Sequence, residues 1–122
     1  MSYAGLLSFI YADVKKDDQR VVAALDWLKK NYTLEENPGM QRAGLFYYYH
    51  LMTKALAAAD VQTLELPDGR KADWKKDLAL KLISAQNADG SWINDNARWM
   101  EKDSVLVTTY CVMSLEIIFR KL

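Results

Sequence analysis

The chain is poor in the residues that mark the most easily recognised classes of function. Lys and Arg number 16 and Asp and Glu also number 16, so the formal net charge is zero. A neutral chain has no excess of positive charge with which to hold nucleic acid or an anionic membrane surface. The single cysteine, Cys111, excludes an internal disulfide and a multi-cysteine metal cluster. We therefore predict no nucleic-acid partner, no bound metal and no cofactor.

Targeting and membrane segments are also missing from the sequence. The first five residues lack the basic start and the cleavage site of a signal peptide. The longest nearly uncharged run, residues 105–119, contains Glu116 and is too short and too polar to cross a membrane. We therefore expect no signal peptide and no transmembrane span in this chain, and a cytoplasmic location by default.

The sequence is rich in apolar residues that recur with the spacing of a helix. Hydrophobic residues make up 51% of the chain, which is enough to build a core. Five segments repeat apolar residues every three or four positions, and polar breaks separate them. Around Pro67, Asp68 and Gly69 the sequence predicts a short hairpin within residues 62–72. The five helices are expected at residues 2–12, 17–32, 41–59, 73–86 and from 103 or 104 to the C-terminus.

The five predicted helices alternate in character along the chain. The first, third and fifth are apolar on nearly every side, whereas the second and fourth carry one apolar stripe, such as Trp74, Leu78 and Leu82. A helix that is apolar all round has to be buried, and an amphipathic helix lies at a surface. The pattern therefore predicts an all-α fold in which antiparallel helices alternate between an inner layer (1, 3, 5) and an outer layer (2, 4).

An internal repeat supports this organisation. Residues 27–31, followed by a loop to Gly39, parallel residues 82–86, followed by a loop to Gly90, and an apolar helix comes after each loop. The spacing of roughly forty to fifty-five residues is that of a two-helix unit. We therefore predict that residues 1–122 form a single domain of about two and a half helix pairs.

The turn from residue 86 to residue 92 carries the most specific signal. Gln86 ends an outer helix, Gly90 supplies a turn conformation, and Trp92 follows two residues later. This pattern resembles the QW repeat motif of squalene and hopene cyclases and of the related protein prenyltransferases. A degenerate first copy has Asn31 in place of Gln, retains Gly39, and has Met40 in place of Trp.

The resemblance implies an α/α toroid in which helix pairs close into a ring around a cavity. Five helices would form only an arc of such a ring. The chain would then be a fragment of a longer toroid, or it would associate with itself, because open ends of a repeat array expose apolar surface. The resemblance further implies an apolar isoprenoid ligand in a cavity lined by helices 1, 3 and 5. The residues expected to line this cavity are Tyr47, Tyr48, His50 and Tyr110.

The run 47–50 has a second interpretation. Successive helical positions differ by about 100°, so three tyrosines and a histidine in a row cover the whole circumference. Some of the rings must therefore face away from any cavity. In the alternative they are large packing residues with tethered hydroxyls, and His50 is a hydrogen-bonded core residue.

The chemistry of the family is missing from this chain. The Asp-x-Asp-Asp acid motif of the cyclases is absent, and the pair Asp17 and Asp18 is expected only to cap a helix. His50 precedes Cys111, and no Asp is close to that cysteine, so the zinc site of the prenyltransferases is not expected. Cys111 is instead predicted to be a small apolar core residue.

Two functions remain open at this level. One is a cyclase- or prenyltransferase-like repeat domain that contributes to an isoprenoid cavity. The other is a non-catalytic α/α module for protein interaction or self-assembly. The loop 94–103 has two interpretations as well, since it could overhang a cavity mouth or form a packed corner plugged by Trp99.

Overall fold

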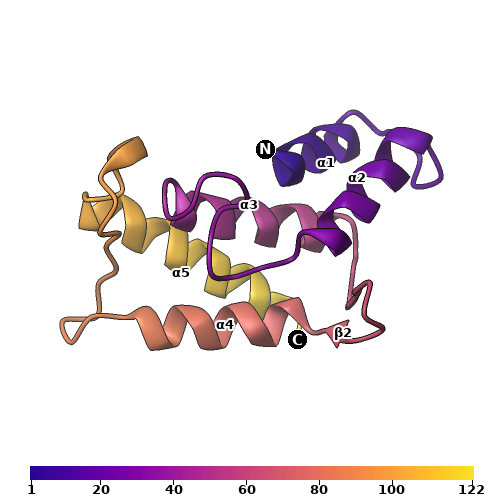
Figure 1. Cartoon of the computed structure of the whole chain (residues 1–122). Helices are drawn as coiled ribbons and strands as arrows, with labels where there is room; N and C mark the ends of the chain where they lie inside the picture. Colours follow the sequence, from indigo (N-terminus) through magenta and orange to yellow (C-terminus); the bar gives the residue numbers. More distant parts are fainter.

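The computed structural model describes all 122 residues, and it confirms the all-α fold with five helices and one short hairpin (Figure 1). Besides the five α-helices there is a single turn of 3₁₀ helix, Arg98–Met100. The elements are α1 (Ser2–Tyr11), α2 (Gln19–Lys30), α3 (Leu45–Ala58), β1 (Leu64–Glu65), β2 (Lys71–Ala72), α4 (Trp74–Ala85) and α5 (Ser104–Arg120).

Helix α3 lies between α1 and α5, and these three helices form one row. Helix α2 packs against α1, and α4 packs against α5. The course of the chain gives α1, α3 and α5 broadly the same direction, and it gives α2 and α4 the opposite one (Figure 1). Each odd-numbered helix is thus followed by an antiparallel partner outside the row.

The central position of α3 shows in its burial. Nine of its 14 residues are buried, whereas α2 buries only Val21 and Leu28. Helices α1 and α5 stand at the two ends of the row, so each has one flank without a neighbour. This is why α5, although apolar on most sides, leaves Val105, Val112 and Phe119 more than half exposed.

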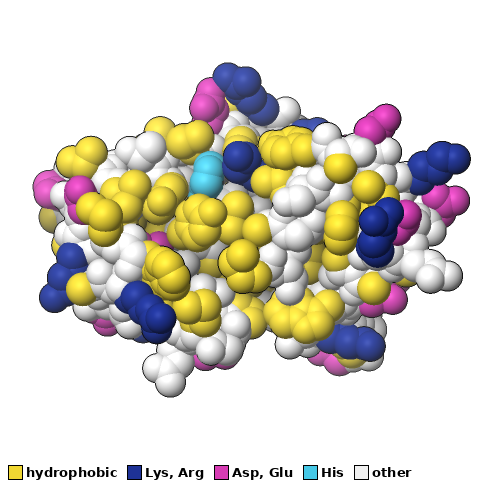
Figure 2. All heavy atoms as spheres, turned by 90° about the horizontal axis from the view of Figure 1, so that it is seen from above, with side chains coloured by type: hydrophobic (Ala, Val, Ile, Leu, Met, Phe, Trp, Pro, Cys, Tyr) yellow, Lys and Arg dark blue, Asp and Glu magenta, His cyan; other side chains and the backbone are white.

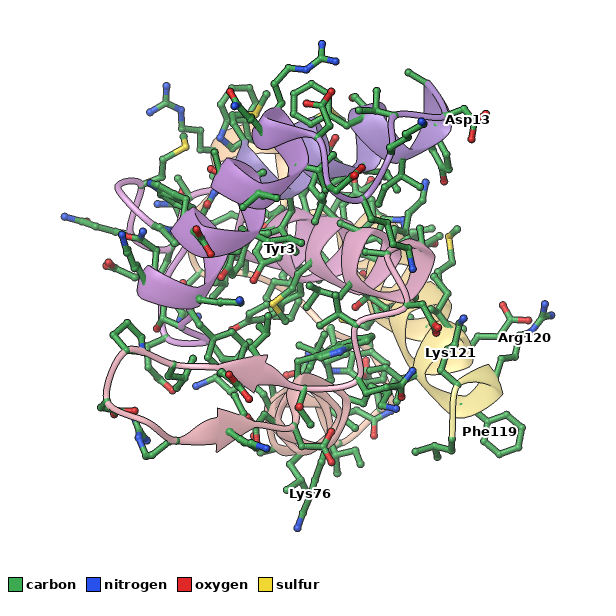
Figure 3. The ribbon with its side chains drawn as sticks, turned by 90° about the vertical axis from the view of Figure 1, so that its right-hand side faces the viewer. Tyr3, Asp13, Lys76, Phe119, Arg120 and Lys121 are labelled. Carbon is green, nitrogen blue, oxygen red and sulfur yellow. The ribbon has the colours of Figure 1, made fainter.

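The segment between α2 and α3 is held against α4 by two side-chain contacts. The Tyr32 hydroxyl donates to the Asp77 carboxylate at 3.0 Å. Lys81 pairs with Glu35 at 2.8 Å. Both links join the loop after α2 to α4. Figure 3 shows Tyr3 directed into the interior, whereas Lys76 and Phe119 point away from it.

One of the two aspartates expected to cap a helix does so, and one predicted helix start was wrong by a few residues. Helix α2 begins at Gln19 and is capped by Asp18, whose carboxylate accepts the Arg20 N–H at 2.9 Å. Helix α3 begins at Leu45 and not at residue 41, because Gln41 (φ 54°) and Gly44 (φ 64°) have left-handed backbone that interrupts a helix.

The predicted hairpin is present as a two-residue pair of antiparallel strands, with Leu64 opposite Ala72. No helix of the chain combines the length and the apolar character that crossing a membrane requires.

Candidate functional site: an apolar pocket at the start of α3 and α5

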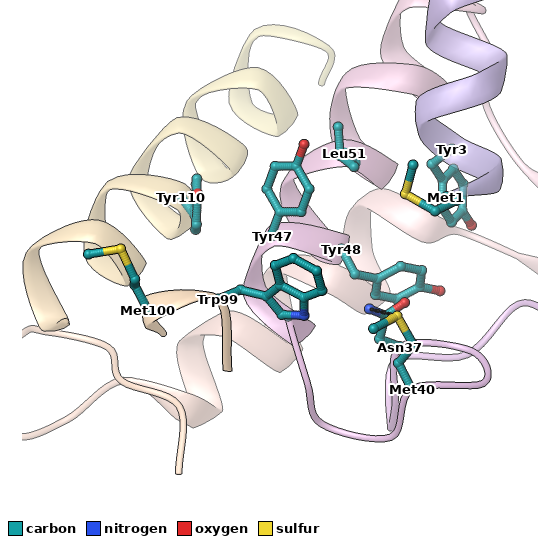
Figure 4. A pocket seen from close by; sticks show the side chains of 11 residues that line it. Met1, Tyr3, Asn37, Met40, Tyr47, Tyr48, Leu51, Trp99, Met100 and Tyr110 are labelled. Atoms are coloured by element: carbon teal, nitrogen blue, oxygen red, sulfur yellow. Dashed lines mark hydrogen bonds between the residues drawn. The ribbon is translucent and has the colours of Figure 1, made fainter. Parts of the chain in front are cut away.

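A pocket of about 640 Å³ opens where α1, α3 and α5 begin (Figure 4). Nine of its 11 lining residues are hydrophobic. Helix α3 contributes Tyr47, Tyr48 and Leu51, and α5 contributes Tyr110. The remaining wall comes from the start of α1 and from the loops that precede α3 and α5. Pockets of roughly 300 to 1,000 Å³ with mostly apolar walls are typical of small-molecule sites.

Three of the four residues expected at the cavity are brought together in the pocket wall. Tyr47 packs on Tyr110 with ring centroids 5.6 Å apart. Tyr48 packs on Tyr3, which also lines the pocket, at 5.5 Å. The wall therefore presents aromatic rings from three helices of the row, and such surfaces bind apolar groups well.

His50 is not among the residues that line the pocket. Its ring stacks on Tyr110 at a centroid distance of 5.6 Å, and its side chain is buried. Its Nδ1 lies 3.5 Å from the Ser114 hydroxyl. Burial lowers the pKa of His50 below its ordinary value of 6.5, and the positive charge of Lys54 adds to this. His50 is accordingly a neutral residue between α3 and α5.

The hydroxyls of the tyrosine run anchor α3 to the preceding loop. Tyr48 donates to the Thr33 carbonyl at 2.8 Å, and Tyr49 donates to the carbonyl of Leu34. Burial raises the pKa of Tyr48 to about 12, so this hydroxyl keeps its proton at neutral pH. Tyr48 thus fits both interpretations of residues 47–50, because its ring lines the pocket and its hydroxyl is hydrogen-bonded to the preceding loop.

The corner formed by Gln86, Gly90 and Trp92 lies outside the pocket. The Gln86 amide donates to the Gly90 carbonyl at 2.9 Å and closes its own loop. It does not bond the free carbonyl groups at the end of α4. Trp92 instead binds a carbonyl at the end of α4, because its buried indole N–H donates to the Leu82 carbonyl in the last turn of that helix at 2.8 Å. Gly90 has φ 87°, which L-residues rarely adopt.

The loop after α2 and the loop after α4 contain main-chain hydrogen bonds of the same pattern. The Asn37 N–H donates to the Gln41 carbonyl at 2.7 Å, and the Asn87 N–H donates to the Ser91 carbonyl at 2.8 Å. In each loop an asparagine thus binds the residue four positions later. The sequence carried this signal in Asn37 and Asn87, but the comparison of Gln86 with Asn31 did not reveal it.

The loop between Trp92 and α5 overhangs the pocket mouth. Trp99 and Met100 both line the pocket, and their exposed fractions are 58% and 70%. Trp99 therefore does not plug a packed corner. Both residues have left-handed backbone, with φ 60° and 62°. Such backbone costs non-glycine residues about 1 to 3 kcal/mol each and persists only where the surroundings enforce it.

Glu101, the next residue along the chain, anchors the loop at this point, and it is fully buried. Its carboxylate accepts the backbone N–H groups of Tyr47 at 2.8 Å and Phe46 at 3.2 Å. The Asn94 amide donates to the same carboxylate at 2.7 Å and also reaches the Arg42 carbonyl at 2.7 Å. The first N–H groups of a helix have no acceptor within it, and a negative charge suits that end.

Sequence reasoning missed Glu101 and Asn94 as partners of α3. A signal was present, because α3 follows Gly44, which offers no side chain to cap the helix. An acceptor therefore had to come from elsewhere in the chain.

No three His, Cys, Asp or Glu side chains lie close enough together to hold a metal ion. No protein-family model, curated protein or solved structure matches this chain.

Proposed function

We propose that the chain is a repeat domain of the squalene/hopene cyclase and prenyltransferase kind that holds an apolar isoprenoid in the pocket at the start of α3 and α5. The observation that carries this proposal is the pocket wall itself, where Tyr47, Tyr48 and Tyr110 meet Trp99 (Figure 4). Aromatic faces suit an unsaturated hydrocarbon chain, which has apolar surface to bury and few polar groups to satisfy. The alternation of row and outer helices and the turn 86–92 support the same assignment.

The proposed role is binding, without an acid or a zinc site in this chain. No charged side chain lines the pocket. The hydrogen bond from Arg20 holds the pKa of Asp18 near 2, so this carboxylate is ionised at neutral pH. A general acid needs a proton to deliver, and Asp18 has none. Asp18 is also committed to capping α2.

A displacement experiment tests the proposal. Nile red, a neutral dye that brightens in apolar surroundings, is bound to the protein and titrated with squalene or with farnesyl diphosphate. We expect squalene, farnesyl diphosphate or both to displace the dye. Leu51→Trp fills the pocket and should weaken dye binding about tenfold. The matched control is Leu80→Trp, because Leu80 is exposed on α4 away from the pocket. Equal dye affinity in both variants would rule out this pocket as the binding site.

The alternative function is a non-catalytic module for protein interaction or self-assembly, and the free flank of α5 favours it. Val105, Val112 and Phe119 follow one another at intervals of seven residues, so they lie on one stripe of the helix. All three are exposed. The face seen from above in Figure 2 also gathers hydrophobic side chains in its middle, with most charged groups towards its edge. Apolar patches of this kind often mark interaction surfaces.

Sedimentation velocity tests self-assembly through the flank of α5. If the flank of α5 joins copies of the chain, Val112→Lys should lower the sedimentation coefficient at a fixed protein concentration. The control Leu80→Lys, on the outer face of α4, should leave it unchanged. A wild-type chain that sediments as a monomer at all concentrations would remove self-assembly as its function.

A further inference from the structure

The loop above the pocket mouth is anchored at its two ends and at Glu101, whereas the side chains of Trp99 and Met100 between these anchors are exposed. At one end, the Asn94 side chain is held between the Arg42 carbonyl and Glu101. At the other end, Asp103 caps α5 by accepting the Val105 N–H at 2.9 Å. Residues 97–102, which we call the lip, connect these points. Within the lip only Glu101 is buried.

Trp99 rests on the start of α3 without being locked there. A Cβ atom on Gly44 would lie 3.1 Å from the indole Cδ1, so one part of the ring touches this glycine. The guanidinium of Arg98 lies 5.3 Å from the ring centroid. More than half of the side chain is exposed, and its indole N–H has no hydrogen-bond acceptor in the protein. A large apolar ring placed in this way can swing without breaking a hydrogen bond.

The backbone favours such a swing. Trp99 and Met100 are consecutive residues with positive φ, and neither is glycine. A return of either residue to ordinary backbone angles would turn the ring away from Gly44. Glu101 would stay in place, because its carboxylate is bound to the first turn of α3. The strained pair therefore adjoins the fixed anchor Glu101 and includes Trp99, the residue whose ring can move.

We propose that the lip opens and closes over the pocket, with Trp99 as the residue that controls ligand entry and Glu101 as the positioning residue that anchors the motion. The identity of the ligand in this inference rests on the proposed function, because Trp99 lines the pocket to which that function assigns an isoprenoid. The substrate class it admits is an apolar chain, which Trp99 covers once it is bound. Loops that close over ligands move on the microsecond to millisecond timescale.

The first test needs no ligand. ¹⁵N relaxation dispersion on the tryptophan indoles of the wild-type chain reports motion at each ring. The indole N–H groups of Trp74 and Trp92 donate to the carbonyls of Val61 and Leu82, so they serve as internal controls. We expect dispersion at Trp99 and flat profiles at the two controls. A flat profile at Trp99 would overturn the proposal, whatever the protein binds.

The second test measures Nile red binding by stopped flow. If Trp99 controls entry, Trp99→Ala should raise the association and the dissociation rate constants together, each by about threefold or more. The control Trp27→Ala, at an exposed position on α2, should change neither. An unchanged association rate with faster dissociation would make Trp99 a fixed wall residue and overturn the proposal. An unchanged pair of rates would overturn it too.

The two tests also separate this inference from the proposed function. If Nile red binds elsewhere, as equal affinities of Leu51→Trp and Leu80→Trp would reveal, the proposed function fails. The dispersion profile of Trp99 then still decides whether the lip moves.

Discussion

The carboxylate of Glu101 accepts the backbone N–H of Tyr47 at 2.8 Å, so a residue just before α5 caps the start of α3. The two residues are 54 positions apart in the chain. The contact joins the loop between α4 and α5 to the first turn of α3. It also places the lip, and with it Trp99 and Met100, against the mouth of the pocket.

Removal of this carboxylate should destabilise the fold strongly. Glu101→Ala leaves the N–H groups of Phe46 and Tyr47 and the Asn94 amide without their acceptor. Each buried donor left unpaired costs about 1 to 3 kcal/mol, so we expect a loss of about 3 kcal/mol or more in the free energy of unfolding. Urea denaturation followed by circular dichroism measures it.

The control for that variant is Glu116→Ala, which removes a carboxylate of similar size from an exposed pair with Arg120. Exposed ion pairs contribute about 0 to 1 kcal/mol, so the control should change stability little. Equal losses in the two variants would mean that Glu101 contributes no more than a surface charge does.

The corner after α4 should depend on the indole N–H of Trp92. Trp92→Phe keeps an aromatic ring but removes the donor to the Leu82 carbonyl. A buried carbonyl without a partner should lower the free energy of unfolding by about 1 to 3 kcal/mol. Trp27→Phe makes the same chemical change at a half-exposed position on α2 and should have almost no effect. Differential scanning calorimetry compares the two melting temperatures.

The strain in the lip predicts an unusual benefit from glycine. Met100 has φ 62° and is mostly exposed, so Met100→Gly loses little packing and relieves the backbone. We expect the free energy of unfolding to rise by up to about 1 kcal/mol. Leu80→Gly, at an exposed position inside α4, should instead lower it by about 1 kcal/mol. If both variants lose stability equally in urea, position 100 is unstrained.

The stability of the chain should fall in mildly acidic solution because of its single histidine. Burial depresses the pKa of His50 in the folded chain below 6.5, the value expected once the chain unfolds. The unfolded chain therefore binds the proton first as the pH falls, and unfolding becomes more favourable. The stabilisation is complete above the unfolded pKa and is lost as the pH falls towards the folded one.

Urea midpoints measured from about pH 7 to about pH 5 test this window, because Asp and Glu side chains titrate mainly below it. We expect the midpoint to decrease in the wild-type chain and to stay level in His50→Gln. A decrease of the same size in the variant would assign the effect to other groups.

Local patterns predicted the helices, because three- and four-residue periodicity depends only on neighbours in sequence. The hairpin at Pro67 to Gly69 followed from turn chemistry in the same way. The start of α3 was misplaced, since the left-handed backbone of Gln41 is not marked by a glycine in the sequence. Turn-forming residues other than glycine carry a weaker signal.

The site was predicted only where helical geometry suffices. Residues 47–50 had to point in different directions, but the sequence could not give the absolute rotation of α3. That rotation depends on the packing of α3 between α1 and α5, and it turns His50 towards Ser114 rather than the pocket. The contact of Glu101 with α3 was beyond reach for a related reason, because it joins residues that only the folded chain brings together.

The Gln86 to Trp92 corner is held by the bond from Gln86 to Gly90 and by the bond from Trp92 to Leu82, and none of its residues lines the pocket. Trp99 and Met100, which do line it, lie further along the chain, just before Glu101. Substitutions at positions 99 and 100 would therefore change the rim of the pocket without removing the hydrogen bonds of this corner. Under the proposed function, ligand selectivity would therefore be set at two adjacent positions, 99 and 100.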